Sequence, residues 1–172
     1  MATSISAIVP FSWFLFAMVS AQGIVDIPSS CIQCLCEAVS GPLSCVPGHF
    51  GSCQDGVCGL YSITRPYWEH AGELTVGLND QNSKNAFENC ALDPTCSVAT
   101  IRSYMVRFQQ DCNNDGKVDC HDFTAIHFHG GYSCNRSLSE SVTTGLNKCL
   151  GASPGQSNIT PTPIPVDFKL GG

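Results

Sequence analysis

An Asp- and Asn-rich segment of the chain has the spacing of a calcium-binding loop. Oxygen-bearing side chains occupy its first, third and fifth places, glycine the sixth, an aliphatic residue the eighth, and Asp the ninth and twelfth. This order is typical of EF-hand loops, in which carboxylate, amide and carbonyl oxygens bind a hard cation. The predicted ligands are Asp111, Asn113, Asp115, the Lys117 carbonyl, Asp119 and Asp122.

The same loop has a second interpretation, an ordinary turn held by disulfides. Its twelfth residue, Asp122, is shorter than the Glu that normally binds calcium through both oxygens. Cys112 and Cys120 lie within the loop and could fix it without a metal. The role of any calcium would be structural, and we expect no cofactor to be required for activity.

Three histidines, His121, His127 and His129, lie close together towards the end of the chain. A histidine beside a Ser or Cys can activate it as a nucleophile. His127 and His129 are two residues apart, however, and cannot point the same way on a helix. No serine is singled out as their partner, so nucleophilic catalysis is the weakest hypothesis.

The twelve cysteines predict an oxidised, extracellular protein. Their number is even, and none lies in the apolar first thirty residues, which favours disulfides over a zinc site. On a first helix, Cys31 and Cys34 share a face while Cys36 points elsewhere, so we expect these three to reach three different distant segments. The sequence alone does not determine which cysteines pair with which. Up to six disulfides are expected among Cys31, Cys34, Cys36, Cys45, Cys53, Cys58, Cys90, Cys96, Cys112, Cys120, Cys134 and Cys149.

The first 21 residues are typical of a secretory signal peptide. An apolar stretch from Ile8 to Val19 is followed by small residues suited to cleavage after Ala21. A membrane anchor is the alternative, but the segment is short, is interrupted by Pro10 and has no flanking charge. We therefore predict a signal peptide at residues 1–21, one domain at 22–150 and a flexible, proline-containing tail at 151–172. The mature protein is expected to be extracellular, monomeric and not inserted in a membrane.

Helix signals dominate the domain. Asp93 and Pro94 predict a helix start, and apolar residues then recur at three- and four-residue steps, at Val98, Ile101, Met105 and Phe108. Other expected helices are one capped by Ser29 or Ser30 and running to about Val39, a weak one over residues 79–89, a short one over 122–128, and one opened by a capping box at 137–140 and ending near Leu150. A short hairpin is expected after residue 41, with a strand at 60–64. These elements predict an α+β, mostly helical and disulfide-rich fold.

The charge excludes one class of partner. Fourteen acidic against eight basic residues give a formal net charge of -6. Such a protein is not expected to bind nucleic acid, and it gains no electrostatic attraction to an anionic bacterial envelope.

Several cysteine-containing segments carry a family resemblance. Cys31, Cys34 and Cys36 precede a Ser-Gly pair, Cys58-Gly-Leu-Tyr61-Ser62-Ile63 follows, and then come Arg65-Pro-Tyr67-Trp68. In that order the segments resemble the invertebrate-type lysozyme (destabilase) family over about residues 31–149. The resemblance implies a lysozyme-like fold and β-1,4-muramidase activity on peptidoglycan. The family's other name also implies an isopeptidase activity, which would need the activated nucleophile considered above.

Glycoside hydrolysis needs two carboxylates across the sugar link, and both positions differ here. The resemblance places the family's acid at Val39 and its second carboxylate at Ser52. Glu37 is no substitute, because two residues along a helix is a turn of about 200°. No residue is therefore predicted to be catalytic, although a displaced carboxylate, Asp55 or Glu73, is the alternative.

The sugar-binding residues that the resemblance implies are better preserved. The expected lining of a glycan cleft is Tyr61, Ser62, Tyr67 and Trp68, of which Ser62 stands where active relatives usually carry Gln. Aromatic faces pack against sugar rings, but Tyr67 and Trp68 could equally be core. Asn135 starts an N-glycosylation sequence, and Asn158 a poorer one.

These observations leave three hypotheses of function. The first is a secreted, antimicrobial-type lysozyme relative that binds peptidoglycan with weak or no hydrolysis. The second is an active hydrolase that uses a displaced carboxylate. The third is a structural or partner-binding secreted module on the same scaffold.

Overall fold

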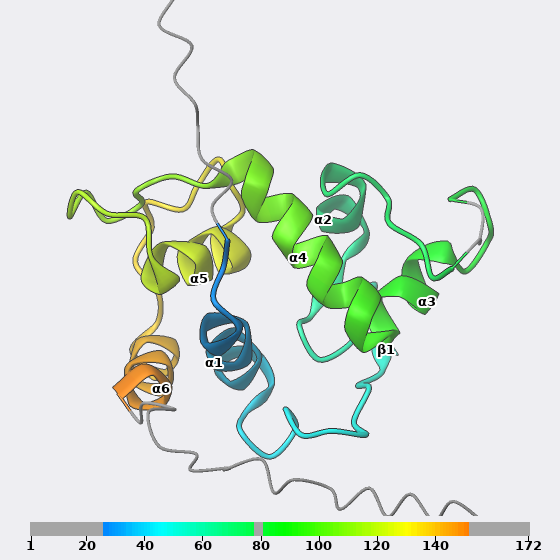
Figure 1. Ribbon diagram of the computed structural model, residues 1–172, viewed down its shortest axis with the longest axis horizontal. Coiled ribbons are helices and arrows are strands. Elements are labelled where there is room, and N and C mark those ends of the chain that lie inside the picture. The colour runs from blue at the N-terminus through cyan, green and yellow to red at the C-terminus, as the bar shows by residue number, and fades with distance from the viewer. Residues whose placement is uncertain (1–25, 78–80, 152–172) are drawn as a thin grey trace, which may run out of the picture.

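Helix α4 (Pro94–Phe108) crosses the middle of the molecule, as the computed structural model shows (Figure 1). The structure describes residues 26–77 and 81–151. As predicted, Asp93 caps α4: its side chain accepts a hydrogen bond from the Cys96 N–H at 2.7 Å. The predicted apolar stripe is also confirmed, since Ile101, Met105 and Phe108 are buried and Val98 packs against the core.

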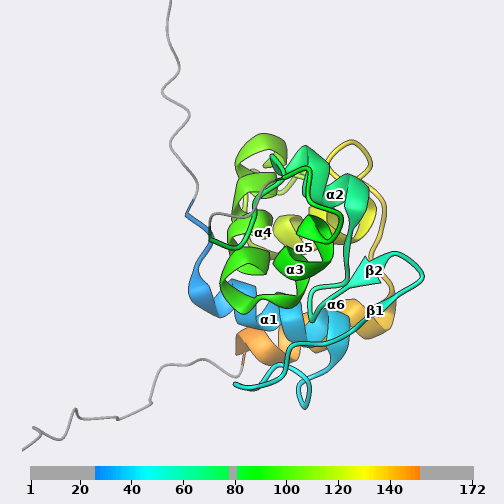
Figure 2. The ribbon, with the colours of Figure 1, turned by 90° about the vertical axis from the view of Figure 1, so that its right-hand side faces the viewer.

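Helices α1 (Ser29–Ser40) and α6 (Glu140–Gly151) pack side by side, as both views show (Figures 1 and 2). The predicted caps of both helices were wrong. No side chain caps α1; instead the Pro28 carbonyl accepts hydrogen bonds from the N–H groups of Cys31 and Ile32. At α6 the hydroxyl of Ser139, not that of Ser137, accepts from the Val142 N–H.

Three two-residue strands form the hairpin region. β1 (Cys53–Gln54), β2 (Val57–Cys58) and β3 (Ile63–Thr64) pair antiparallel in that order. The strand predicted at 60–64 starts only at Ile63, because residues 59–62 turn: the Ser62 N–H donates to the Gly59 carbonyl, and Ser62 has a φ of 51°. This turn brings the chain back towards α1, where the Ser40 hydroxyl donates to the Leu60 carbonyl at 2.6 Å.

Helix α2 (Arg65–His70) follows directly and was not predicted. The Thr64 hydroxyl accepts from the Tyr67 N–H, and Pro66 lies in the first turn. Helix α3 (Ala86–Leu92) begins later than the expected 79–89, and α5 (Cys120–His129) is longer than 122–128. Helices α2, α3 and α5 all pack against α4, which makes α4 the centre of the core.

Six disulfides join all twelve cysteines. Helix α1 holds three of them, and one of these closes a loop of only nine residues, so the expectation of three distant segments was wrong for Cys36. The other two fasten α1 to α5 and to α6. The pairs are Cys31–Cys120, Cys34–Cys149, Cys36–Cys45, Cys53–Cys58, Cys90–Cys96 and Cys112–Cys134.

The mostly helical fold with a small hairpin agrees with the predicted class. Among the described residues, no helix has both the length and the apolarity to cross a membrane. The predicted signal peptide, the tail beyond Gly151 and Asn158 lie outside the described residues.

Candidate functional site

A pocket of about 450 Å³ opens where the end of α1 meets the hairpin, α2, α4 and α5. We call it the cleft pocket. Four segments distant in sequence contribute to it, at residues 39, 57–70, 104 and 127–130, so only the folded chain creates it. It is lined by Val39, Val57, Ser62, Thr64, Pro66, Tyr67, His70, Tyr104, His127, Phe128 and Gly130.

Two stacked tyrosines form the buried part of the lining. The rings of Tyr67 on α2 and Tyr104 on α4 lie with their centroids 3.7 Å apart and their planes 13° from parallel. Burial, and then the neighbouring Tyr104, raise the pKa of Tyr67 well above its ordinary value. The Tyr67 hydroxyl therefore keeps its proton and acts as a hydrogen-bond donor.

His127 on α5 is fixed by the hairpin and by α2. Its Nε2 lies 2.8 Å from the Tyr61 carbonyl, which can only accept, so Nε2 carries the proton. Its Nδ1 lies 3.3 Å from the Tyr67 hydroxyl and accepts from it. Although part of the ring reaches the pocket, burial lowers the pKa of His127 to about 4, against the opposing effect of the hydrogen bond to Tyr61. The histidine is a neutral positioning group at neutral pH.

None of the described side chains that line the cleft pocket is a carboxylate. Val39, in the position expected for the acid, is half-buried and contributes only methyl groups to the wall. Glu37 does not line the pocket, and its Oε1 accepts instead from the Gln33 amide at 2.9 Å. The pocket thus lacks both a proton donor of the carboxylic type and an anionic nucleophile.

The alternative carboxylates lie elsewhere. Asp55 is an exposed turn residue with a φ of 51°, and it lines a neighbouring pocket together with Ser52. Val57 and Ser62 line both pockets and form the wall between them. Glu73 lines neither.

The predicted sugar-binding residues separate into two groups. Ser62 and Tyr67 line the cleft pocket. Trp68 is 2% exposed, packs against Phe87 and donates its indole N–H to the Leu74 carbonyl, so it belongs to the core. Tyr61 is also buried, and its contribution is the carbonyl that holds His127.

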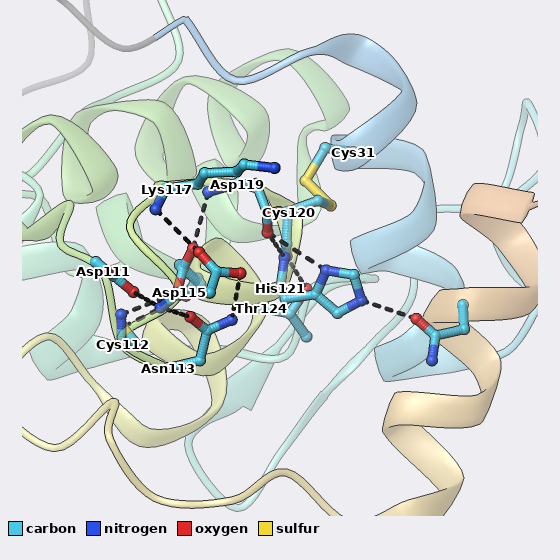
Figure 3. A network of polar contacts seen from close by, with 12 residues as sticks. Cys31, Asp111, Cys112, Asn113, Asp115, Lys117, Asp119, Cys120, His121 and Thr124 are labelled. Carbon is cyan, nitrogen blue, oxygen red and sulfur yellow. Dashed lines mark hydrogen bonds and ion pairs between the residues drawn. A yellow bond between two sulfur atoms is a disulfide. The ribbon is translucent and has the colours of Figure 1, made fainter.

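The segment predicted to bind calcium forms a loop before α5 (Figure 3). Its carboxylates accept hydrogen bonds from the loop's own backbone. Asp111 accepts from the N–H groups of Asp115 and Gly116, and Asp115 accepts from that of Lys117. Within the described residues, no group of three or more His, Cys, Asp or Glu side chains is placed to hold a metal ion.

Asp122 has a different role from the one predicted for it. It is 1% exposed, and its two oxygens accept from the N–H groups of Cys112 and Asp119, each at 2.8 Å. Together with the Asp119 side chain, which accepts from the His121 N–H, it forms a capping box at the start of α5. The cap role of Asp122 was not predicted, and calcium ligation by this carboxylate stays a prediction.

Among the described contacts, no histidine is hydrogen-bonded to a Ser or Thr hydroxyl that it could activate. All twelve cysteines are in disulfides. His121 bonds to Asp119 and to the Asn147 side chain, and His127 bonds to Tyr61 and Tyr67. Asn135 is exposed, as an N-glycosylated residue must be. Glycosylation at this residue stays a prediction.

Sequence reasoning did not place Thr64, Pro66, His70, Tyr104 or Phe128 at the site. The Thr-x-Pro start of α2 would have been the signal for the first three. Tyr104 also had a signal, since it lies three residues after Ile101 and four before Phe108, on the buried face of α4.

The chain was compared with known proteins and structures. A sequence model of the Destabilase family matches residues 28–149. Invertebrate-type lysozyme 3 of Caenorhabditis elegans is 28% identical over 127 residues, which cover 73% of this chain and 88% of that protein. A lysozyme of Magallana gigas is 30% identical over 112 residues, 63% of this chain and 69% of that protein.

Similarity in structure supports the same fold. A chain in the crystal structure of Aeromonas hydrophila PliI in complex with Meretrix lusoria lysozyme superposes with a TM-score of 0.54. The match has 22% identity and covers 76% of this chain and 98% of that one.

Proposed function

This chain belongs to the destabilase family of invertebrate-type lysozymes, and on that premise we propose that it binds the glycan strands of bacterial peptidoglycan with weak or no hydrolysis. Family membership supports a peptidoglycan-directed, lysozyme-like function. The finer statement, binding without efficient cleavage, depends on one observation: the described lining of the cleft pocket contains no carboxylate.

The lining suits a sugar even though it lacks the chemistry of hydrolysis. Pyranose rings present apolar C–H faces and polar edges, so they bind best between aromatic or aliphatic surfaces and a few fixed polar groups. Phe128 and Val57 provide exposed apolar surface, and Ser62 and Thr64 provide hydroxyls. The pair of Tyr67 and His127 adds a rigid, uncharged part of the wall.

Loss of a general acid costs a factor of about 10² to 10⁴ in rate. Retaining hydrolysis also needs a second carboxylate about 5 Å from the first. An active enzyme that uses Asp55 would have to bind its substrate across the wall formed by Val57 and Ser62. For that reason the binding function is favoured over the displaced-carboxylate enzyme.

We also propose that the protein is secreted. Six disulfides persist in an oxidising compartment, and the apolar leader of the sequence fits export. The mature protein is expected to be an extracellular monomer.

Two assays on the mature protein test this function. Sedimentation with insoluble peptidoglycan should deplete the protein from the supernatant, whereas turbidity of the same suspension should fall far more slowly than with a lysozyme that has both carboxylates. Phe128→Ala should weaken sedimentation, and Leu43→Ala, which changes an exposed residue outside the pocket, is the control. Rapid clearance abolished by Asp55→Asn would establish the enzyme instead, and absence of sedimentation would leave the partner-binding module.

A further inference from the structure

Another pocket, of about 540 Å³, lies where the beginning of α5 meets the loop before it, the segment 134–138 and α6. We call it the Asn135 pocket. It uses the first turns of α5, whereas the cleft pocket uses the end of that helix, at His127 and Phe128. Among the described residues the two pockets share no lining, so a group held in the Asn135 pocket leaves the cleft pocket free.

Asn135, at the rim of this pocket, begins the N-glycosylation sequence Asn135-Arg136-Ser137. All three residues are exposed, and within the described part of the chain no other group bonds to the Asn135 side chain. Its backbone is held, because the neighbouring Cys134 forms a disulfide with Cys112, which lines the same pocket. A sugar attached to Asn135 therefore starts from a fixed point beside the pocket.

The lining offers both kinds of surface that a sugar ring needs. Leu138, half-buried against the core, provides apolar surface for the C–H face of the ring. The Arg136 guanidinium has no ion-pair partner among the described residues and can donate to sugar oxygens. The Thr143 hydroxyl donates to the Ser139 carbonyl at 3.1 Å, and its oxygen can still accept from a sugar hydroxyl or an acetamido N–H. The volume also falls in the range of about 300–1,000 Å³ that small-molecule sites have.

The walls of the pocket belong to separate parts of the chain. In the loop before α5, Asp111 and Asp115 accept from the loop's own backbone. Helix α6 packs on α1 and reaches α5 through His121, whose Nε2 lies 2.8 Å from Asn147 Oδ1 (Figure 3). A sugar in the pocket lies against the loop, α5 and α6 together. Contacts of this kind exist only in the folded chain, so they stabilise it.

We propose that Asn135 carries an N-linked glycan whose first N-acetylglucosamine packs in the Asn135 pocket and fastens the loop and α6 to α5. In the transfer, the side-chain nitrogen of Asn135 forms a bond to C1 of this sugar and loses one proton. The bond from C1 to the pyrophosphate of a lipid-linked oligosaccharide breaks, and the lipid pyrophosphate leaves. This inference rests on the proposed secretion, and it does not depend on the proposed binding of peptidoglycan in the cleft pocket.

The first measurement asks whether the glycan is present. The whole chain is secreted from animal cells in which mannose trimming is inhibited, with Asn158→Gln so that Asn135 begins the one Asn-X-Ser/Thr sequence left. The intact mass should show one glycan, which peptide mapping places on Asn135. Ser137→Thr keeps the acceptor sequence and should keep the glycan, whereas Ser137→Ala and Asn135→Gln should lack it.

The second measurement asks whether the first sugar is held in the pocket. An endoglycosidase that cuts between the first two sugars leaves a single N-acetylglucosamine on Asn135. This form should keep the melting temperature of the full glycoprotein, about 2–5 °C above that of Ser137→Ala and of Asn135→Gln, which corresponds to one or two hydrogen bonds. Arg136→Ala keeps the acceptor sequence and the glycan. Its melting temperature should exceed that of the double variant Arg136→Ala with Asn135→Gln by less than this, because a donor to the sugar is lost.

The outcomes separate glycosylation from secretion and from binding in the cleft pocket. Secreted protein without a glycan overturns the inference and keeps secretion, whereas a chain retained in the cells without a glycan overturns both. A single-sugar form that melts like Ser137→Ala overturns the packing of the sugar in the Asn135 pocket. Sedimentation with peptidoglycan should be equal for the glycosylated protein and Ser137→Ala, and its absence from both overturns the cleft function while keeping the glycan.

Discussion

Tyr67 donates its hydroxyl proton to Nδ1 of His127 at 3.3 Å, and this bond joins α2 to α5 in the wall of the cleft pocket. The same imidazole donates from Nε2 to the Tyr61 carbonyl of the hairpin. One neutral ring thus connects α5 to α2 and to the adjoining hairpin, 60 and 66 residues earlier in the chain. Protonation would place a positive charge on this buried ring, so the stability of this wall should depend on pH.

Stability should fall as the pH falls from about 6.5 to about 4. The folded-state pKa of His127 is lowered to about 4, whereas an unfolded histidine titrates near 6.5. Between these values the unfolded chain binds a proton that the folded chain refuses, so the contribution is complete above pH 6.5 and is lost through this window. The loss should be about 3 kcal/mol, because a shift of one pKa unit corresponds to about 1.4 kcal/mol. Urea unfolding of wild type and His127→Gln across pH 4–7 measures it.

Glutamine at residue 127 keeps a donor for Tyr61 but does not titrate. The variant should therefore show a flatter stability profile in this window, and His49→Gln, at an exposed residue outside the cleft pocket, serves as the matched control. Identical slopes for wild type and His127→Gln would remove His127 from the explanation.

Val39→Glu alone should not create an efficient lysozyme. The new carboxyl would enter a wall formed by Val57 and aromatic rings, but the cleft pocket would still lack the partner carboxylate that hydrolysis requires. Clearance of a peptidoglycan suspension should stay at least about 100-fold below that of an active family member. Circular dichroism on the same sample checks that the variant is folded.

The informative comparison is the double variant Val39→Glu with Ser52→Asp. A gain in the double variant that both single variants lack would show that the scaffold still accommodates the pair. Strong activity of Val39→Glu by itself would mean that Asp55 or another acid already reaches the substrate.

Asp122→Ala should destabilise the protein by about 2–4 kcal/mol, because it leaves the N–H groups of Cys112 and Asp119 without their acceptor in a buried place. The loss should be the same in excess calcium and in chelator, since Asp122 acts as a cap. Wild type should likewise show equal melting temperatures in both conditions. Asp115→Ala, in the exposed part of the loop, should cost less than about 1 kcal/mol.

Calcium binding would produce the opposite pattern. A ligand that binds only the folded state adds about 2.7 kcal/mol at a hundredfold excess over its Kd. A calcium-dependent rise in melting temperature that Asp115→Ala abolishes would restore the calcium hypothesis for this loop.

Gly59→Ala should be far more damaging than Gly56→Ala, although both glycines have positive φ in the hairpin region. A Cβ at Gly59 would lie 2.0 Å from the Ala91 carbonyl oxygen, whereas nothing lies within 4 Å of one at Gly56. We expect about 1–2 kcal/mol for Gly56→Ala and about 3–5 kcal/mol for Gly59→Ala. Chemical denaturation of the two variants measures the difference, and equal losses would contradict the close approach of the hairpin to α3.

Much of the fold could be predicted because its signals are local. Asp93 and Pro94 define the start of α4 within two residues, and the stripe ending at Phe108 identifies its buried face. Helix α2 escaped prediction because six residues are too few to show a periodic pattern. The cap of α6 was misplaced because two neighbouring serines satisfy the same rule, whereas α1 has no side-chain cap and Ser29 and Ser30 lie inside its first turn.

The site was only partly predictable, since burial depends on partners distant in sequence. Tyr67 and Trp68 are adjacent and of similar character, yet Tyr67 stacks on Tyr104 in the cleft pocket while Trp68 packs on Phe87 in the core. The missing carboxylate at residue 39 could be predicted from the family resemblance. The role of Asp122 could not, because its partner Cys112 is ten residues away across the loop.

Three disulfides fix α1 at Cys31, Cys34 and Cys36, three to eight residues before Val39. The position of the last turn of this helix is consequently fixed by disulfides and does not depend on the side chain at residue 39. Substitution there can change what the cleft does to a sugar while the architecture around it persists. In such a scaffold, catalytic activity and folding stability depend on different residues, so activity can be lost during evolution while the fold is kept.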